Sequence, residues 1–147
     1  MIKKILIAVD GSKHSLTCVA LGAQIAKAID SKVLLYHVVR PYNLPDSLRV
    51  FAKAEHMQTF DPELLRKGAQ YLLAGALSEA RRNGLKDVEI ETDEGPIARS
   101  IIDRAQTYKA DMIVIGARGM GDMEGLLRGG VSQRVETMAK CPVLVVK

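Results

Sequence analysis

Short apolar runs alternate along the chain with longer segments in which apolar residues recur every three or four positions. A continuous apolar run is typical of a strand buried on both faces, and the longer spacing is typical of an amphipathic helix. Five runs are expected to form strands, and they span residues 5–9, 33–39, 88–92, 112–115 and 142–146. The third run alternates apolar with polar residues, which predicts a half-exposed or edge strand.

Segments with helical spacing separate these runs, and they cover residues 15–29, 63–83, 96–105 and 131–139. Ser12 is positioned to cap the first helix, while Asp61-Pro62 and Gly84 bound the second. Strands that alternate with helices predict an α/β fold, with a parallel sheet covered by helices on both faces. The stretch from Arg40 to Phe60 is too long for a structureless connection, and its apolar spacing suggests a small helix.

The length of 147 residues predicts a single domain that covers residues 1–147. The apolar runs are far shorter than the roughly 20 residues of a membrane-spanning helix, and the first run is too short for a signal peptide, so we expect a cytoplasmic protein. A net charge of +4 suits an anionic ligand, but Lys and Arg are spread along the chain, so nucleic-acid binding is not expected. Cys18 and Cys141 form no CxxC pair and are expected to be buried.

Half of the glycines, six of twelve, lie between Gly116 and Gly130, just after the fourth predicted strand. Glycine lacks a Cβ and tolerates positive φ, so successive amides in such a loop can turn toward an anion. The helix predicted from Val131 adds free N–H groups, a positive dipole end and the Ser132 hydroxyl. Arg118 could contribute charge, although loop arginines are more often solvated. The alternative is that these glycines only make the loop flexible.

Ligands of open parallel sheets bind at the carboxyl ends of strands, where the strand order reverses. Asp10 follows the first predicted strand and Gly116 follows the fourth, so the two residues would face one crevice if these strands are neighbours. Asp10 is suited to an Asx turn or helix cap, to a ribose hydroxyl, or to a Mg²⁺ ion that bridges phosphates. His37 could line the crevice, but packing against a helix is the favoured interpretation.

No catalytic residue is identified in the sequence, and metal binding is left open. The sequence GxxxxGK[ST] is absent, and GxGxxG fails after Gly121. His14, His37 and His56 lack metal-ligand spacing, and no Ser or Cys has a recognisable partner base.

The spacing Gly116-x2-Gly119-x9-Gly129 resembles the glycine motif of the nucleotide-binding branch of the universal stress protein family. The resemblance extends over essentially the whole chain, through residues 5–12, 34–38, 111–116 and 141–146. It implies a five-stranded parallel sheet of order 3-2-1-4-5, a Rossmann-like fold of the adenine nucleotide alpha hydrolase type, and ATP held between the loops after the first and fourth strands.

Site residues follow from the same resemblance. Ala8, Val9, Val38 and Ile115 would surround adenine, and Asp10 and Gly116 would contact the ribose. The phosphates would lie against Gly119, Gly129, Gly130, Val131 and Ser132.

Gly130 is a departure, because the family has Ser or Thr directly after the last glycine of the motif. The missing hydroxyl would cost roughly 0.5–1.5 kcal/mol, and up to about 3 kcal/mol for a charged partner. Affinity would then fall several-fold to about a hundredfold without loss of the site. Ser132 is a candidate to compensate in part.

Three functions are compatible with the sequence. The favoured one is a regulatory module that binds ATP or a related adenine nucleotide, with or without Mg²⁺. The others are an interaction protein of the same fold with an empty glycine loop, and a slow ATP hydrolase that positions water near Asp10. The apolar run from Val143 to Val146 would be an exposed edge in a monomer, so we expect a homodimer through this strand, as the resemblance also implies.

Overall fold

The computed structural model describes residues 1–40, 50, 54, 62–117 and 130–147. The strands are β1 (Lys4–Ala8), β2 (Lys32–Val39), β3 (Val88–Glu94), β4 (Met112–Gly116) and β5 (Val143–Val146). The helices are α1 (Lys13–Ile29), α3 (Pro62–Arg82), α4 (Ile97–Tyr108) and α5 (Gly130–Met138). The small helix suggested between residues 40 and 60 lies almost wholly outside the described residues.

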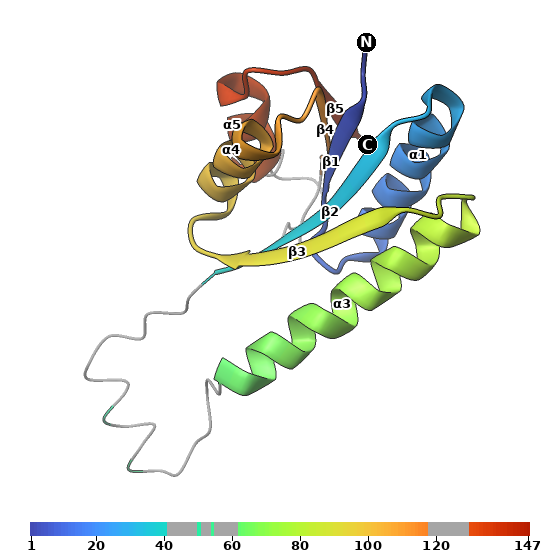
Figure 1. Ribbon diagram of the computed structural model, residues 1–147. Coiled ribbons are helices and arrows are strands. Elements are labelled where there is room, and N and C mark those ends of the chain that lie inside the picture. The colour runs from blue at the N-terminus through green and yellow to red at the C-terminus, as the bar shows by residue number, and fades with distance from the viewer. Residues whose placement is uncertain (41–49, 51–53, 55–61, 118–129) are drawn as a thin grey trace.

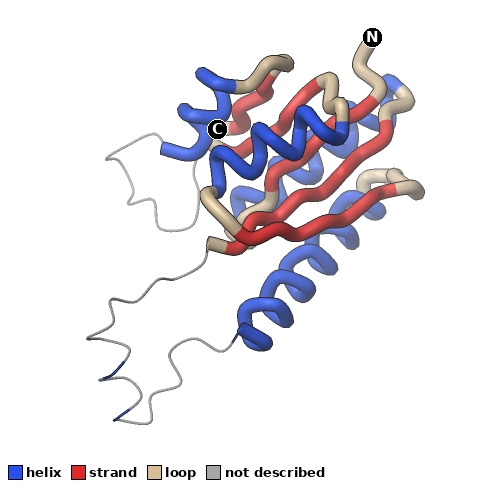
Figure 2. Tube along the Cα trace, turned by 60° about the vertical axis from the view of Figure 1, so that its left-hand side comes forward, coloured by secondary structure: helices blue, strands red, loops and turns tan. Residues whose placement is uncertain are grey.

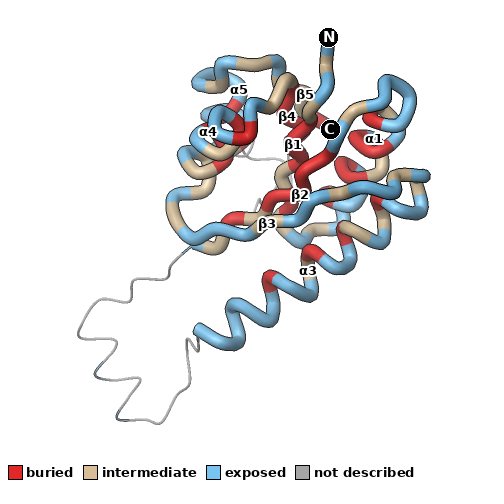
Figure 3. Tube along the Cα trace, in the orientation of Figure 1, coloured by how far each residue is buried: buried red, intermediate tan, exposed pale blue. Residues whose placement is uncertain are grey.

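All five strands are parallel and form one sheet in the order β3-β2-β1-β4-β5 (Figure 1). The predicted fold class and strand order are therefore confirmed. β1 lies in the middle, paired with β2 on one side and with β4 on the other, and Ile5, Leu6 and Ile7 are fully buried. Figure 3 shows the buried residues concentrated along the central strands.

Helices cover both faces of the sheet, and each face has its own apolar core (Figure 2). Ile5 and Ile7 of β1 pack in the core beneath α1 and α3. Leu6, which lies between them in sequence, belongs to the core beneath α4 and α5. This alternation follows from the two-residue period of a strand and explains why the run is apolar throughout.

Helix α1 lies very close to β1 at Gly22. A Cβ added to this glycine would lie 2.5 Å from Cδ1 of Ile7, which is a fully buried side chain. The glycine therefore sets how closely the helix can approach the sheet. By contrast, a Cβ added at Gly75 of α3 would meet nothing within 4 Å.

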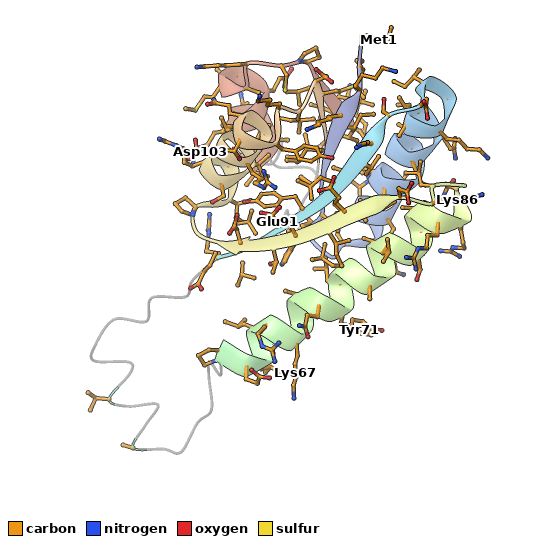
Figure 4. The ribbon with its side chains drawn as sticks, in the orientation of Figure 1. Met1, Lys67, Tyr71, Lys86, Glu91 and Asp103 are labelled. Carbon is orange, nitrogen blue, oxygen red and sulfur yellow. The ribbon has the colours of Figure 1, made fainter. Side chains whose placement is uncertain are left out.

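The two edges of the sheet differ in character. β3 is an edge strand, as predicted, but it runs on to Glu94 and carries the acidic side chains of Glu89, Glu91, Asp93 and Glu94. Arg104 of α4 donates to both carboxylate oxygens of Glu91, which Figure 4 labels. β5, at the opposite edge, has only apolar residues.

Other details refine the sequence-based expectations. Cys18 is buried, but Cys141, expected to be buried as well, is only half-buried beside the turn into β5. No helix in the described part of the chain is both long and apolar enough to span a membrane.

We predict opposite effects for two glycine substitutions. Gly22→Val should lower the free energy of unfolding by about 1–3 kcal/mol, because the new side chain must displace Ile7 from a filled core. Gly75→Ala should raise it by about 0.5–1 kcal/mol, because the helical glycine gains a better helix former in open space. Urea unfolding measures both, and equal effects of the same sign would contradict this account of the α1–β1 contact.

Candidate functional site

The carboxyl edge of the sheet has a notch above β1. Pairing of β1 with β2 ends at Ala8 and Tyr36, although β2 continues to Val39. On the other side, pairing of β1 with β4 ends at Ile7 and Val114. β1 thus stops before both of its neighbours at the point where the strand order reverses, which is where ligands of open parallel sheets bind.

The main chain of Val38 faces this notch. Successive residues of an inner parallel strand direct their N–H and C=O groups to alternate neighbours. The Tyr36 carbonyl accepts from Val9 N–H of the β1 side at 2.9 Å, and the Val39 carbonyl accepts from Gly95 N–H of the β3 side at 3.0 Å. The N–H and C=O groups of Val38 therefore point toward the β1 side of the strand, at a level beyond the end of β1.

The chain leaves β1 through a tight turn at residues 10–12. Asp10 Oδ1 accepts from the Ser12 N–H at 2.9 Å and from the Ser12 hydroxyl at 2.7 Å, and Ser12 Oγ accepts from the Ser15 N–H at 3.1 Å. Gly11 has a φ of 86°, and a Cβ there would also lie 2.6 Å from Cδ1 of Leu72. The Asx turn and the Ser12 cap are therefore confirmed, and they hold the Asp10 carboxylate at the rim of the notch.

A cavity of about 370 Å³ occupies the notch, and this volume lies in the range of small-molecule sites. Its walls are mainly apolar and come from β1, β2 and β4 and from the N-terminal parts of α1, α3, α4 and α5. The polar residues that line it include Asp10, His37, Arg40 and Ser132.

The structure brings together nine of the twelve site residues named from the sequence. They line the cavity, and they are Ala8, Val9, Asp10, Val38, Ile115, Gly116, Gly130, Val131 and Ser132. The other three, Arg118, Gly119 and Gly129, lie outside the described residues. The contact of each residue with a ligand remains a prediction.

The first turn of α5 forms one end of the cavity. Gly130, Val131 and Ser132 are its first three residues, and Ser132 is 5% exposed. The first N–H groups of a helix have no partner within the helix, and the dipole gives this end a partial positive charge. This end of the cavity is thus suited to an anionic group.

His37 lines the cavity, so the favoured interpretation of a histidine that only packs against a helix is wrong. Its Nδ1 lies 2.7 Å from the Val9 carbonyl oxygen. Because a carbonyl only accepts, Nδ1 carries the proton and donates it. The contact spans two strands, and the residue types alone do not indicate it.

Tyr36, Ile97 and Ile101 are wall residues that the sequence does not identify as site residues. The two isoleucines are predicted only as part of the apolar face of a helix. The Tyr36 hydroxyl donates to Asp93 Oδ2 at 2.7 Å, and burial together with this bond raises the pKa of Tyr36 above its ordinary value. The hydrogen bond fixes the ring in the wall. Tyr36 and Val38 lie on the same face of β2, a period-two signal that could have identified the tyrosine.

The universal stress protein family matches the chain over residues 1–147. A universal stress protein of Methanocaldococcus jannaschii, MJ0531, is 37% identical over 147 residues, which cover 99% of this chain and 82% of that protein. A universal stress protein of Thermus aquaticus is 31% identical over 147 residues, covering all of both chains.

Solved structures of similar fold include three with adenine nucleotides. A universal stress protein in complex with cAMP has a TM-score of 0.74 and 24% identity, covering 99% of this chain and 96% of that one. The Archaeoglobus fulgidus protein in complex with dAMP has a TM-score of 0.69 and 24% identity, covering 100% of both chains. An Arabidopsis thaliana family protein with AMP bound has a TM-score of 0.66 and 21% identity, covering 99% and 91%. At these identities the likeness shows the fold.

Proposed function

Because the chain belongs to the universal stress protein family, we propose that its cavity binds an adenine nucleotide and that the protein acts as a regulatory module. The observation that carries this proposal is the notch above β1, where the main-chain N–H and C=O groups of Val38 face a cavity with apolar walls. The cAMP, dAMP and AMP complexes of structural relatives support the class of ligand.

The main chain of Val38 suits the Watson–Crick edge of adenine. Adenine presents an N6 amino donor next to the N1 acceptor, and one residue supplies a carbonyl acceptor next to an N–H donor. Proteins commonly recognise an exposed base through this edge while apolar side chains cover its faces. Ile97, Ile115 and Tyr36 are placed in the walls to provide such cover.

The remainder of the nucleotide would extend across the rim toward α5. Asp10 and Gly116 are the groups proposed for the ribose, since they flank the notch from β1 and β4. The phosphates are assigned to the N-terminus of α5, where the first N–H groups of the helix and the helix dipole favour negative charge. Arg118, Gly119 and Gly129 remain part of this proposal on the strength of the glycine motif.

Titration calorimetry of nucleotide-free protein tests the proposal with ATP, AMP and cAMP, each with and without Mg²⁺. Saturable binding of at least one adenine nucleotide is expected. GTP should bind at least about tenfold more weakly, because guanine presents O6 and N1–H where adenine presents N6–H and N1, leaving polar groups of Val38 unpaired. The absence of saturable heat with every adenine nucleotide would refute the proposal.

Gly130 offers a direct test of the phosphate position. A Cβ added there meets no atom of the described residues within 4 Å, so we expect that a serine can be accommodated. Gly130→Ser should tighten ATP binding several-fold to about a hundredfold, because it supplies the hydroxyl donor that the family motif has at this position. Gly130→Ala is the matched control, since it adds the Cβ without the hydroxyl. Adenosine lacks phosphate, so its affinity should be the same in all three proteins; equal ATP affinities would contradict the assignment.

The contrast between the sheet edges supports a homodimer through β5. Acidic side chains along an edge strand discourage pairing, so β3 is a poor interface, whereas the apolar β5 is open to pairing. Pairing of two β5 strands would also cover the half-buried side chains of Val143, Leu144 and Val145.

A proline in β5 can separate dimerisation from folding. The Pro142 and Val146 carbonyls accept from the N–H groups of Ile113 and Ala117. By alternation, the Val145 N–H points away from β4. Val145→Pro should therefore give a folded monomer, because proline is tolerated where the N–H of an edge strand makes no ladder bond.

Sedimentation at micromolar concentration measures the outcome, with the wild type expected as a dimer. Leu144→Pro is the control, because it removes an N–H directed at β4 and should destabilise the fold itself. A monomeric wild type, or a Val145→Pro variant that remains dimeric, would overturn the proposed interface.

A further inference from the structure

We infer that His37 is a positioning residue for the base: by holding the Val9 carbonyl, it keeps the Val38 N–H available to a ligand. The inference rests on the proposed adenine site and assigns a function to a side chain that would not itself need to contact the nucleotide.

A regular parallel ladder would continue past the last β1–β2 bond. Val9 N–H donates to the Tyr36 carbonyl at 2.9 Å, and the next bond of such a ladder would run from Val38 N–H to the Val9 carbonyl. Among the main-chain hydrogen bonds of the described residues, none joins Val38 to Val9. The Val9 carbonyl instead accepts from His37 Nδ1 at 2.7 Å. The imidazole thus takes the position that the Val38 N–H would have in the ladder.

The peptide unit between Val9 and Asp10 is held by side chains at both of its polar groups. His37 donates to its carbonyl, and its N–H, that of Asp10, donates to Ser15 Oγ at 3.2 Å. Ser15 is 4% exposed and lies in the first turn of α1. The Val9 side chain, also 4% exposed, remains in the core beneath α1 and α3. The chain therefore leaves the sheet here with its buried polar groups satisfied, as burial requires.

The Val38 N–H can donate either to the Val9 carbonyl or to a ligand. Without the His37 donor, a hydrogen bond from the Val38 N–H to the Val9 carbonyl would become favourable, because a buried carbonyl without a partner costs free energy. β1 would then pair for one more residue, and the Val38 N–H would be engaged within the sheet. Adenine would have to break that bond before it could use the N–H.

The test compares two variants of nearly equal size. His37→Asn retains an amide donor near the position of Nδ1, whereas His37→Leu has a similar branched shape without a donor. Calorimetric titration with AMP should show affinity within about threefold of wild type for the asparagine variant and a loss of about tenfold or more for the leucine variant. Equal affinities of wild type and leucine variant, or equal losses in both variants, would overturn the inference.

Amide exchange followed by NMR separates this inference from the proposed function. In the ligand-free protein, the Val38 amide should exchange more slowly in His37→Leu than in wild type, because it joins the ladder. This comparison needs no nucleotide. If the wild type failed to bind AMP, the adenine site would be refuted, but Val38 exchange would still test whether His37 prevents the hydrogen bond between Val38 and Val9. Unchanged Val38 exchange in His37→Leu would refute the claim that His37 keeps the Val38 N–H out of the β1–β2 ladder.

His37→Phe provides a second route if His37→Leu does not fold. It keeps an aromatic ring at this position without a donor, so it should likewise slow Val38 exchange and weaken AMP binding. Ser15→Ala is the control, because it changes the N–H side of the same peptide unit but leaves the His37 donor on the Val9 carbonyl, so Val38 exchange should stay close to that of the wild type. Thermal unfolding of each variant verifies that the fold is retained. Unchanged Val38 exchange in His37→Phe would overturn the inference.

Discussion

The architecture depends on a constraint at its central strand: β1 is hydrogen-bonded on both sides and buried on both faces, so every main-chain polar group it carries needs a partner. Within the strand, the ladders to β2 and β4 supply those partners. Where the strand ends, side chains must supply them, and His37 and Ser15 do so for the peptide between Val9 and Asp10. The cavity exists because the central strand stops before its neighbours without leaving that peptide unsatisfied.

Much of this arrangement could be predicted from sequence, because strands buried on both faces and amphipathic helices have distinct apolar periods. The carboxyl ends of the first and fourth predicted strands also indicate Asp10 and Gly116 as residues of one crevice. Val9 shows where the pattern fails. Its side chain is in the core, so the apolar pattern includes it in the strand. Its carbonyl, however, accepts from the His37 side chain and not from the β2 main chain, and β1 ends at Ala8. The apolar pattern of side chains indicates which residues are buried, whereas main-chain hydrogen bonds determine where the strand ends.

His37 and β3 were harder to predict for related reasons. A histidine between apolar residues of a strand has no local feature that reveals a hydrogen bond to the main chain of another strand. Asp93 and Glu94 disfavour a strand by composition, yet they pair with Val38 and Val39, and the Tyr36 hydroxyl holds Asp93 in place. Both outcomes depend on contacts between segments distant in sequence, which overrode local preference.

The position of Tyr36 in the cavity wall also gives the protein an optical reporter of this site. The chain has no tryptophan and four tyrosines, so its near-ultraviolet absorption and emission arise mainly from phenol rings. Of the tyrosines that the structure describes, Tyr71 is 84% exposed on α3, where Figure 4 labels it, and Tyr108 lies over the Lys4 ammonium at the first residue of β1. The hydroxyls of Tyr36 and Tyr108 are both bonded to carboxylates, but Tyr36 alone among these three rings lines the cavity. The spectrum of the unlabelled protein therefore carries a component that senses occupancy of the cavity.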